Sequence, residues 1–194
     1  MSIPAQPDPT EETERPERTV VTGHFLSLDG VAEAPDRFVT AWDDETDASG
    51  VELIATQDAV ILGRQSYDEW AEFWPDSDIE PFASFINAVP KYVATSTPLA
   101  REWRNSHVID GELVEFVRNL KGRPGGDIGV HASITVTRAL LAAGVVDELR
   151  FVVAPTIAAT GQRLFDGLPP IRLELIRGAA SPSGYLLVRY RVVP

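Results

Sequence analysis

Three short polar segments of this sequence carry side chains that could hold a phosphorylated ligand. They are Gly63-Arg64-Gln65-Ser66, Thr95-Ser96-Thr97 and His131-Ala132-Ser133. Glycine permits a tight turn, and the guanidinium of Arg64 offers a planar fork of donors that suits a phosphate. Adjacent hydroxyl groups and a serine at a helix start can bind the same group, because a helix N-terminus attracts anions. The three segments together predict a phosphate-binding edge.

Each segment also has a purely structural explanation. Ser133 could simply cap a helix, hydroxyl groups are common in loops, and a lone histidine such as His131 more often serves the structure than a ligand. Arg64 differs from these, because a cation at the start of a helix is unfavourable against the helix dipole. That mismatch favours a functional role for Arg64.

Two acids are candidates for orienting a substrate or relaying a proton, Asp29 and Asp44. Asp29 lies in Ser27-Leu28-Asp29-Gly30, where a turn alone would also favour Asp-Gly. Asp44 follows Asp43 in the first turn of an expected helix, and it suits a proton donor only if burial raises its pKa. We favour Asp44 by a small margin. The nearby Trp42, together with 73–74, could wall a flat ligand or pack the core.

The elements that must position these residues follow from hydrophobic patterning. The stretch 127–165 reads as strand, turn, helix and strand, a βαβ unit that places residues 131–133 just beyond the carboxyl end of its first strand. Strands are expected over 19–28, 58–63, 91–95, 106–109, 128–130 and 148–153. Helices are expected from 43–45 onward and over 64–74, 81–88, 112–121 and 134–143, with an irregular loop at 34–41. Residues 171–176 and 185–193 predict a closing antiparallel hairpin. The fold class is α/β, with three layers and a mostly parallel sheet.

Composition narrows the function. The chain has 194 residues, 44% of them hydrophobic, which suits one domain over 19–194 preceded by a disordered, acidic, proline-rich tail at 1–18. A net charge of −12 argues against nucleic acid or an anionic membrane as partner. There is no cysteine and hence no thiolate zinc site, and we expect no metal. Without a signal peptide or a long apolar run, a cytoplasmic location is expected.

Six motifs in order carry a family resemblance. They are S-L-D-G at 27–30, I-L-G-R-x-S-Y at 61–67, P-K-Y-V at 90–93, V-H-A-S at 130–133, V-D-E-L at 146–149 and P-x5-G-x-R-L-F at 155–165. The chain resembles the dihydrofolate-reductase-like family that includes the reductase domain of bifunctional riboflavin-biosynthesis enzymes. The zinc deaminase domain of those enzymes has no counterpart here, so the chain looks like a stand-alone reductase.

The resemblance implies NADPH as cofactor, a small-molecule substrate and a homodimer. It implies that Gly63, Arg64, Gln65 and Ser66, with Thr95 and Ser96, hold the adenosine 2′-phosphate. It implies that Val130, His131, Ala132, Ser133 and Ile134 hold the pyrophosphate and nicotinamide side. Ser27 and Trp42 would contact the substrate.

Two alanines depart from the family pattern. Ala132 and Ala159 stand where glycine is usual, and alanine disfavours a positive φ and could crowd the phosphates. Changing Ala132 to glycine should therefore tighten NADPH, and we expect a slight loss of stability because glycine raises the entropy of the unfolded chain.

The function expected is an NADPH-dependent oxidoreductase that transfers hydride to a C=N or C=O of a small pyrimidine- or pterin-like substrate. The reaction implied is that of 5-amino-6-(5-phosphoribosylamino)uracil reductase. One alternative is dihydrofolate reductase proper. Another, from a different class of protein, is a non-catalytic nucleotide-binding dimeric scaffold.

Overall fold

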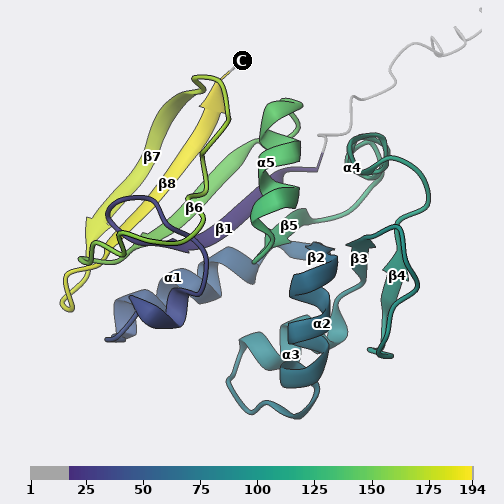
Figure 1. The fold of residues 1–194 in the computed structure, drawn as a ribbon, viewed down its shortest axis with the longest axis horizontal. Coiled ribbons are helices and arrows are strands. Elements are labelled where there is room, and N and C mark those ends of the chain that lie inside the picture. Colours follow the sequence, from purple (N-terminus) through teal and green to yellow (C-terminus); the bar gives the residue numbers. More distant parts are fainter. Residues whose placement is uncertain (1–17, 194) are drawn as a thin grey trace, which may run out of the picture.

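The protein is built on one mixed β-sheet. In this computed structural model, which describes residues 18–193, the sheet has eight strands in the order β4-β3-β2-β5-β1-β6-β8-β7 (Figure 1). Strands β1 to β6 are parallel to one another, and β8 and β7 close the sheet antiparallel to β6 and to each other. The strands are β1 (Val20–Leu26), β2 (Gln57–Gly63), β3 (Lys91–Ala94), β4 (Ser106–Val108), β5 (Asp127–His131), β6 (Glu148–Val153), β7 (Arg172–Ala180) and β8 (Leu186–Val193).

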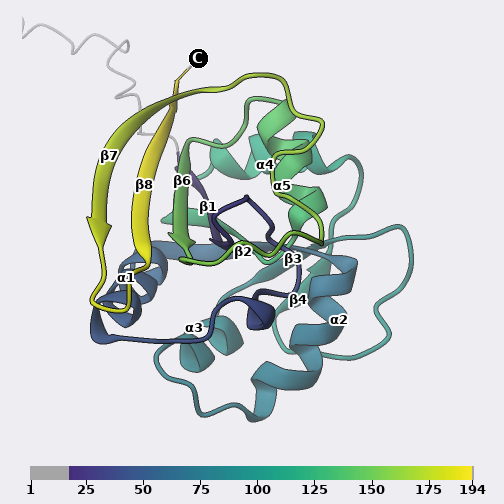
Figure 2. The ribbon, with the colours of Figure 1, turned by 60° about the vertical axis from the view of Figure 1, so that its left-hand side comes forward.

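Helices cover both faces of the sheet, which confirms the expected three layers (Figure 2). On one face, α4 (Leu113–Lys121) and α5 (Ile134–Ala142) pack on alternate strand residues such as Ile61 and Val130. On the other, α2 (Arg64–Phe73) and α3 (Phe82–Ala88) pack on Leu62 and its neighbours. A helix α1 (Asp44–Ile54) covers the same face near β1. Because side chains alternate along a strand, buried runs such as β2 serve both cores.

Helix α1 and the closing hairpin are tied together through one carboxylate. Asp43 caps α1 by accepting from the Thr46 amide at 2.9 Å. Its other oxygen accepts from the Ser181 hydroxyl at 2.7 Å and from the Ser183 amide at 2.8 Å, both in the β7–β8 turn. Partial burial acts to raise the pKa of Asp43, but these donors outweigh it and hold that pKa well below its usual range. The turn and the start of α1 therefore hold each other in place.

Several elements differ from the expectation by one or two residues at their ends, and three differences are larger. Strand β7 runs to Ala180, because its pairing with β8 continues past the expected end at 176. The loop at 34–41 contains a short 3-10 turn, Pro35–Arg37. Arg18, assigned to the disordered tail, is instead buried, and it donates to the Gly126 carbonyl and pairs with Asp58. The rest of the predicted tail, residues 1–17, lies outside the described residues.

No helix within residues 18–193 is long and apolar enough to cross a bilayer.

Two histidines are buried inside this fold as neutral groups. His131 contacts the Gln57 side-chain oxygen at 2.7 Å, and Gln57 is oriented by its own hydrogen bond to the Leu53 carbonyl. Nε2 of His131 therefore carries the proton. His24 contacts the Thr137 hydroxyl at 2.9 Å. Burial lowers the pKa of His131 to about 4. Burial, and then repulsion by His131 once acid has protonated it, lower the pKa of His24 to about 3.

These shifts predict stability that falls as the solution is acidified from pH 6.5 toward 4. In that range an unfolded histidine binds a proton while the folded one does not, so each contributes a slope of up to about 1.4 kcal/mol per pH unit. Because the ordinary pKa values of Asp and Glu are lower than that of His, the change in stability between pH 6.5 and 5 reports mainly on the histidines. Urea unfolding at several pH values measures this. A His131→Gln variant should show a shallower slope, and an unchanged slope would contradict the assignment.

Candidate functional site

The three polar segments meet at one end of the parallel strands, which we call the carboxyl edge of the sheet. They follow the carboxyl ends of β2, β3 and β5, which lie side by side in the order β3-β2-β5. Open α/β sheets bind ligands at this edge. The segments also contact one another, since residue 63 bonds to residue 133 and residue 64 bonds to residue 97.

Ser133 joins the turns after β2 and β5. Its hydroxyl oxygen accepts from the Gly63 amide at 2.6 Å and donates to the Ser66 hydroxyl at 2.9 Å. Although it stands at the N-cap position of α5, its side chain makes no cap hydrogen bond there, among the residues described. A side chain at Gly63 would place its Cβ 3.2 Å from that same hydroxyl oxygen. The Ser133 side chain therefore sets the spacing of the turns, and the backbone of α5 is left to meet a ligand.

Arg64 bridges the turns after β2 and β3. Its Nη1 donates to the Thr97 hydroxyl at 2.8 Å and to the Pro98 carbonyl at 2.6 Å, and its Nε donates to Asp68 at 2.7 Å. The guanidinium is thus oriented before any ligand binds. Asp68 was missed in the sequence analysis, although its spacing of four residues from Arg64 on a helix is a signal for pairing.

Gln65 and Ser66 complete the β2–α2 turn in different ways. Gln65 is exposed and donates to Glu69 at 3.0 Å, whereas Ser66 is buried beneath the turn against Ser133. The side chain of Gln65 can therefore reach a ligand, whereas the side chain of Ser66 holds the backbone of the turn in place.

A pocket of about 410 Å³ opens beside the hydroxyl-rich turn after β3. Six residues line it: Ala94, Thr95, Ser96, Ile109, Gly111 and Leu113. Its volume falls within the range of small-molecule sites, roughly 300–1,000 Å³. Ile109, Gly111 and Leu113 follow β4 and could not be associated with Thr95 and Ser96 from sequence, because parallel pairing of β3 with β4 brings them together.

Two alanines of this region have a left-handed backbone, which glycine would adopt more readily. Ala132 has φ 56° and Ala159 has φ 62°, so both hold the positive φ that alanine disfavours. Such a conformation costs an alanine about 1–2 kcal/mol. The turn after β5, which contains Ala132, leads into α5, whose first N–H groups lack partners within the helix.

The other residues of this turn are less accessible. Val130 is fully buried in the core. Ile134 is partly buried and packs against the same core. The His131 ring lies under α2 and α3, 5.8 Å from the Phe82 ring and 6.2 Å from the Trp70 ring. His131 and Val130 therefore shape the turn from below, and Ala132 is its exposed residue.

Asp29 fastens two loops together. One oxygen accepts from the Ser27 hydroxyl at 2.7 Å and the Ala158 amide at 2.9 Å, and the other accepts from the Ala159 amide at 3.1 Å. The Ser27 and Ala158 donors lower the pKa of Asp29 to about 2, so it is ionised at neutral pH. Ser27 itself is buried and accepts from the Val31 amide. This arrangement favours positioning over proton donation for Asp29.

Asp44 and Trp42 lie at the start of α1, beyond the end of β1. Asp44 is exposed, and its neighbour Asp43 supplies the helix cap. Trp42 is 48% exposed, its ring lies 5.5 Å from the Phe25 ring, and its indole N–H donates to Asp47. Trp42 thus presents an open aromatic face at a fixed orientation. Phe73 is also exposed, while Trp74 packs against Phe82.

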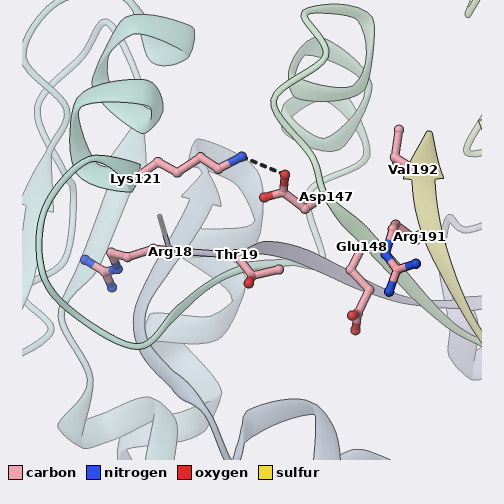
Figure 3. Close-up of a pocket in the computed structure, with 7 residues that line it drawn as sticks. All are labelled: Arg18, Thr19, Lys121, Asp147, Glu148, Arg191 and Val192. Carbon is pink, nitrogen blue, oxygen red and sulfur yellow. Dashed lines mark hydrogen bonds and ion pairs between the residues drawn. The ribbon is translucent and has the colours of Figure 1, made fainter. Parts of the chain in front are cut away.

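A second pocket, of about 390 Å³, lies at the other end of the strands, away from the three polar segments (Figure 3). It lies at the amino ends of β1 and β6 and mixes cations with acids, such as Lys121 with Asp147 at 2.6 Å. Its lining consists of three cations, two acids, a threonine and a valine: Arg18, Lys121, Arg191, Asp147, Glu148, Thr19 and Val192. Parallel sheets do not bind ligands at this edge as a rule. Within residues 18–193 no group of three or more histidine, aspartate or glutamate side chains is arranged to hold a metal ion.

Comparison with known proteins identifies the family of this chain. Residues 18–187 match the model of the RibD C-terminal domain family. The uncharacterized protein YyaP of Bacillus subtilis is 26% identical over 180 residues, which cover 90% of this chain and 95% of YyaP.

Two solved structures share the fold. A pyrimidine reductase-like protein from Corynebacterium diphtheriae has a TM-score of 0.67 at 18% identity, covering 92% of this chain and 93% of that one. Dihydrofolate reductase from Enterococcus faecalis, in complex with NADP(H), has a TM-score of 0.60 at 14% identity, covering 91% of this chain and 97% of that one.

The fold is therefore the dihydrofolate-reductase-like fold that the six motifs implied, with a mostly parallel sheet and a C-terminal antiparallel hairpin. The family match spans most of the chain and supports a reductase-like role. This protein belongs to the RibD C-terminal domain family.

Proposed function

We propose that this protein is an NADPH-dependent oxidoreductase. The observation that carries the proposal is the alignment, along one sheet edge, of a small-molecule pocket, an oriented guanidinium and the N-terminus of α5. Their order along β3, β2 and β5 suits a ligand with an adenosine at one end and a pyrophosphate further along. A dinucleotide has this form.

The described residues fit such a cofactor. The pocket between residues 94–96 and 109–113 would take the adenosine, and Arg64 with Gln65, Thr95 and Ser96 would bind its 2′-phosphate. The backbone of 132–134 would meet the pyrophosphate, because N–H groups and the helix dipole both favour an anion there. Gly63, Ser66, Val130 and His131 would hold the turns in shape. NADPH supplies the hydride in reactions of this class.

The substrate we propose is a small pyrimidine- or pterin-like molecule reduced at a C=N or C=O, of the 5-amino-6-(5-phosphoribosylamino)uracil type. The exposed ring of Trp42 could stack on a flat heterocycle. Ser27, being buried, would act through the backbone of its turn. Asp44 is exposed in the free protein, so the burial that a proton donor needs would have to come from the bound substrate. On that condition we propose Asp44 as the proton donor, and Asp29 as the group that orients the loops around the substrate.

A nucleotide-binding scaffold without activity is a second candidate. It is favoured by the methyl group of Ala132, which stands at the turn where the phosphates would lie. Turnover of NADPH over a panel of pterin and pyrimidine substrates separates the two: an enzyme oxidises NADPH with at least one of them, and a scaffold with none.

We also propose a cytoplasmic homodimer. Two exposed leucines two residues apart on the terminal strand β7, Leu173 and Leu175, support self-association, since large apolar side chains grouped on a surface favour a partner. Sedimentation equilibrium would test this, and the mass of a single chain would contradict it.

The first prediction concerns cofactor choice. NADPH should bind more tightly than NADH, and Arg64→Ala should remove most of the difference, about ten- to a hundredfold, because one charge-assisted contact is lost. NADH serves as the internal control, since it lacks only the 2′-phosphate. Calorimetric titration measures both. Equal affinities in the unmodified protein would refute the assignment of Arg64.

The second prediction concerns the strained alanine. Because Ala132 holds a positive φ, Ala132→Gly should raise the stability by about 0.5–1 kcal/mol, with strain relief exceeding the entropy cost of glycine. This reverses the slight loss expected from sequence. NADPH affinity should rise as well, because the methyl group is removed. Thermal unfolding and titration measure the two effects, and Ala142→Gly, in the last turn of α5, is a control that should destabilise.

The third prediction concerns the acids. Asp44→Asn should lower turnover by roughly 10²–10⁴-fold with NADPH affinity preserved, and the loss should shrink at low pH where solvent can protonate the substrate. Asp29→Asn should chiefly lower thermal stability, because it weakens the acceptor that joins two loops. Full turnover in both variants would show that neither acid is the donor.

A further inference from the structure

Asp68 is the carboxylate nearest the guanidinium that would receive the 2′-phosphate. It lies one helical turn from Arg64 on α2, and its Oδ2 accepts from Arg64 Nε at 2.7 Å. Its other oxygen, Oδ1, is buried and has no hydrogen-bond partner in the part of the chain that the structure describes. The negative charge of Asp68 is therefore balanced chiefly by Arg64.

Arg64 does not depend on Asp68 for its orientation. Its Nη1 is held by neutral acceptors in the turn after β3, the Thr97 hydroxyl and the Pro98 carbonyl. These bonds cross between two strands and keep the guanidinium plane at the sheet edge. What Asp68 adds is mainly a compensating charge.

The surroundings of this pair are acidic as well. Between Arg64 and Phe73, α2 carries one arginine and three acids, a net charge of −2. Glu72 in this helix pairs with Arg101 at 3.1 Å, away from the turn. A 2′-phosphate at this turn would thus meet a guanidinium already paired with one carboxylate, in a chain of net charge −12.

We infer that Asp68 is a specificity-determining residue that limits the preference of this site for NADPH over NADH. Its carboxylate competes with the 2′-phosphate for Arg64 and repels it, whereas NADH presents a neutral hydroxyl group at the same point. The inference rests on the proposed function. It assigns to Asp68 a limit on the margin between the two cofactors that Arg64 creates.

The test is a titration of both cofactors into the full chain and its Asp68→Asn variant. Asparagine keeps an oxygen that can accept from Arg64 Nε and removes the charge. NADPH should bind about two- to fivefold more tightly to the variant, as for one partly exposed charge interaction, with NADH affinity unchanged. The gain should shrink as salt rises, because ions screen exposed charges.

A matched control is Glu72→Gln, which removes the same charge from the same helix but leaves the Arg64 pair intact. It should leave the ratio of the two affinities close to that of the unmodified protein. If the control changes the ratio as much as Asp68→Asn does, the effect belongs to the net charge of α2, and the inference falls.

Two further outcomes separate this inference from the proposed function. If the unmodified chain binds NADPH and Asp68→Asn leaves that affinity unchanged or weakens it, the inference is wrong and the proposed function stands. If the unmodified chain binds neither cofactor in calorimetry, the proposed function is wrong and the inference falls with it.

Discussion

The hydrogen bond from the Gly63 amide to the Ser133 hydroxyl, 2.6 Å long and buried, is the contact on which the proposed site depends. It joins two turns that lie seventy residues apart in sequence and that follow neighbouring strands. A Cβ at position 63 would lie 3.2 Å from the same hydroxyl oxygen, a tight contact, so glycine suits this close approach. The spacing between the turns that we propose would hold the 2′-phosphate and the pyrophosphate follows from this bond.

Two carboxylates hold loops of this protein in place by accepting hydrogen bonds. Asp29 binds backbone amides of the loop at 158–159, and Asp43 binds the hairpin turn while capping α1. In both cases a carboxylate replaces backbone pairing that an irregular loop cannot supply. The loops that would surround a substrate are thereby fixed to the sheet without a large apolar core of their own.

Much of this architecture could be predicted from local pattern. The buried runs of β2 and β5, the aromatic α2 and the closing hairpin each have a distinct periodicity, and Gly63-Arg64 stood out because a cation opposes the helix dipole. The positive φ of Ala132 could not be foreseen, since alanine avoids it and tertiary contacts impose it. Nor could the acceptor role of Asp29, whose partners lie about 130 residues away.

The central claim is that a phosphorylated dinucleotide lies along the carboxyl edge, from the turn after β3 to the start of α5. Backbone amide NMR during an NADPH titration tests it most directly. The account predicts shifts at Gly63, Ser96, Ala132 and Ile134, with little change at Lys121 and Asp147 on the opposite edge. Shifts confined to the amino edge, or none at saturating NADPH, would contradict it.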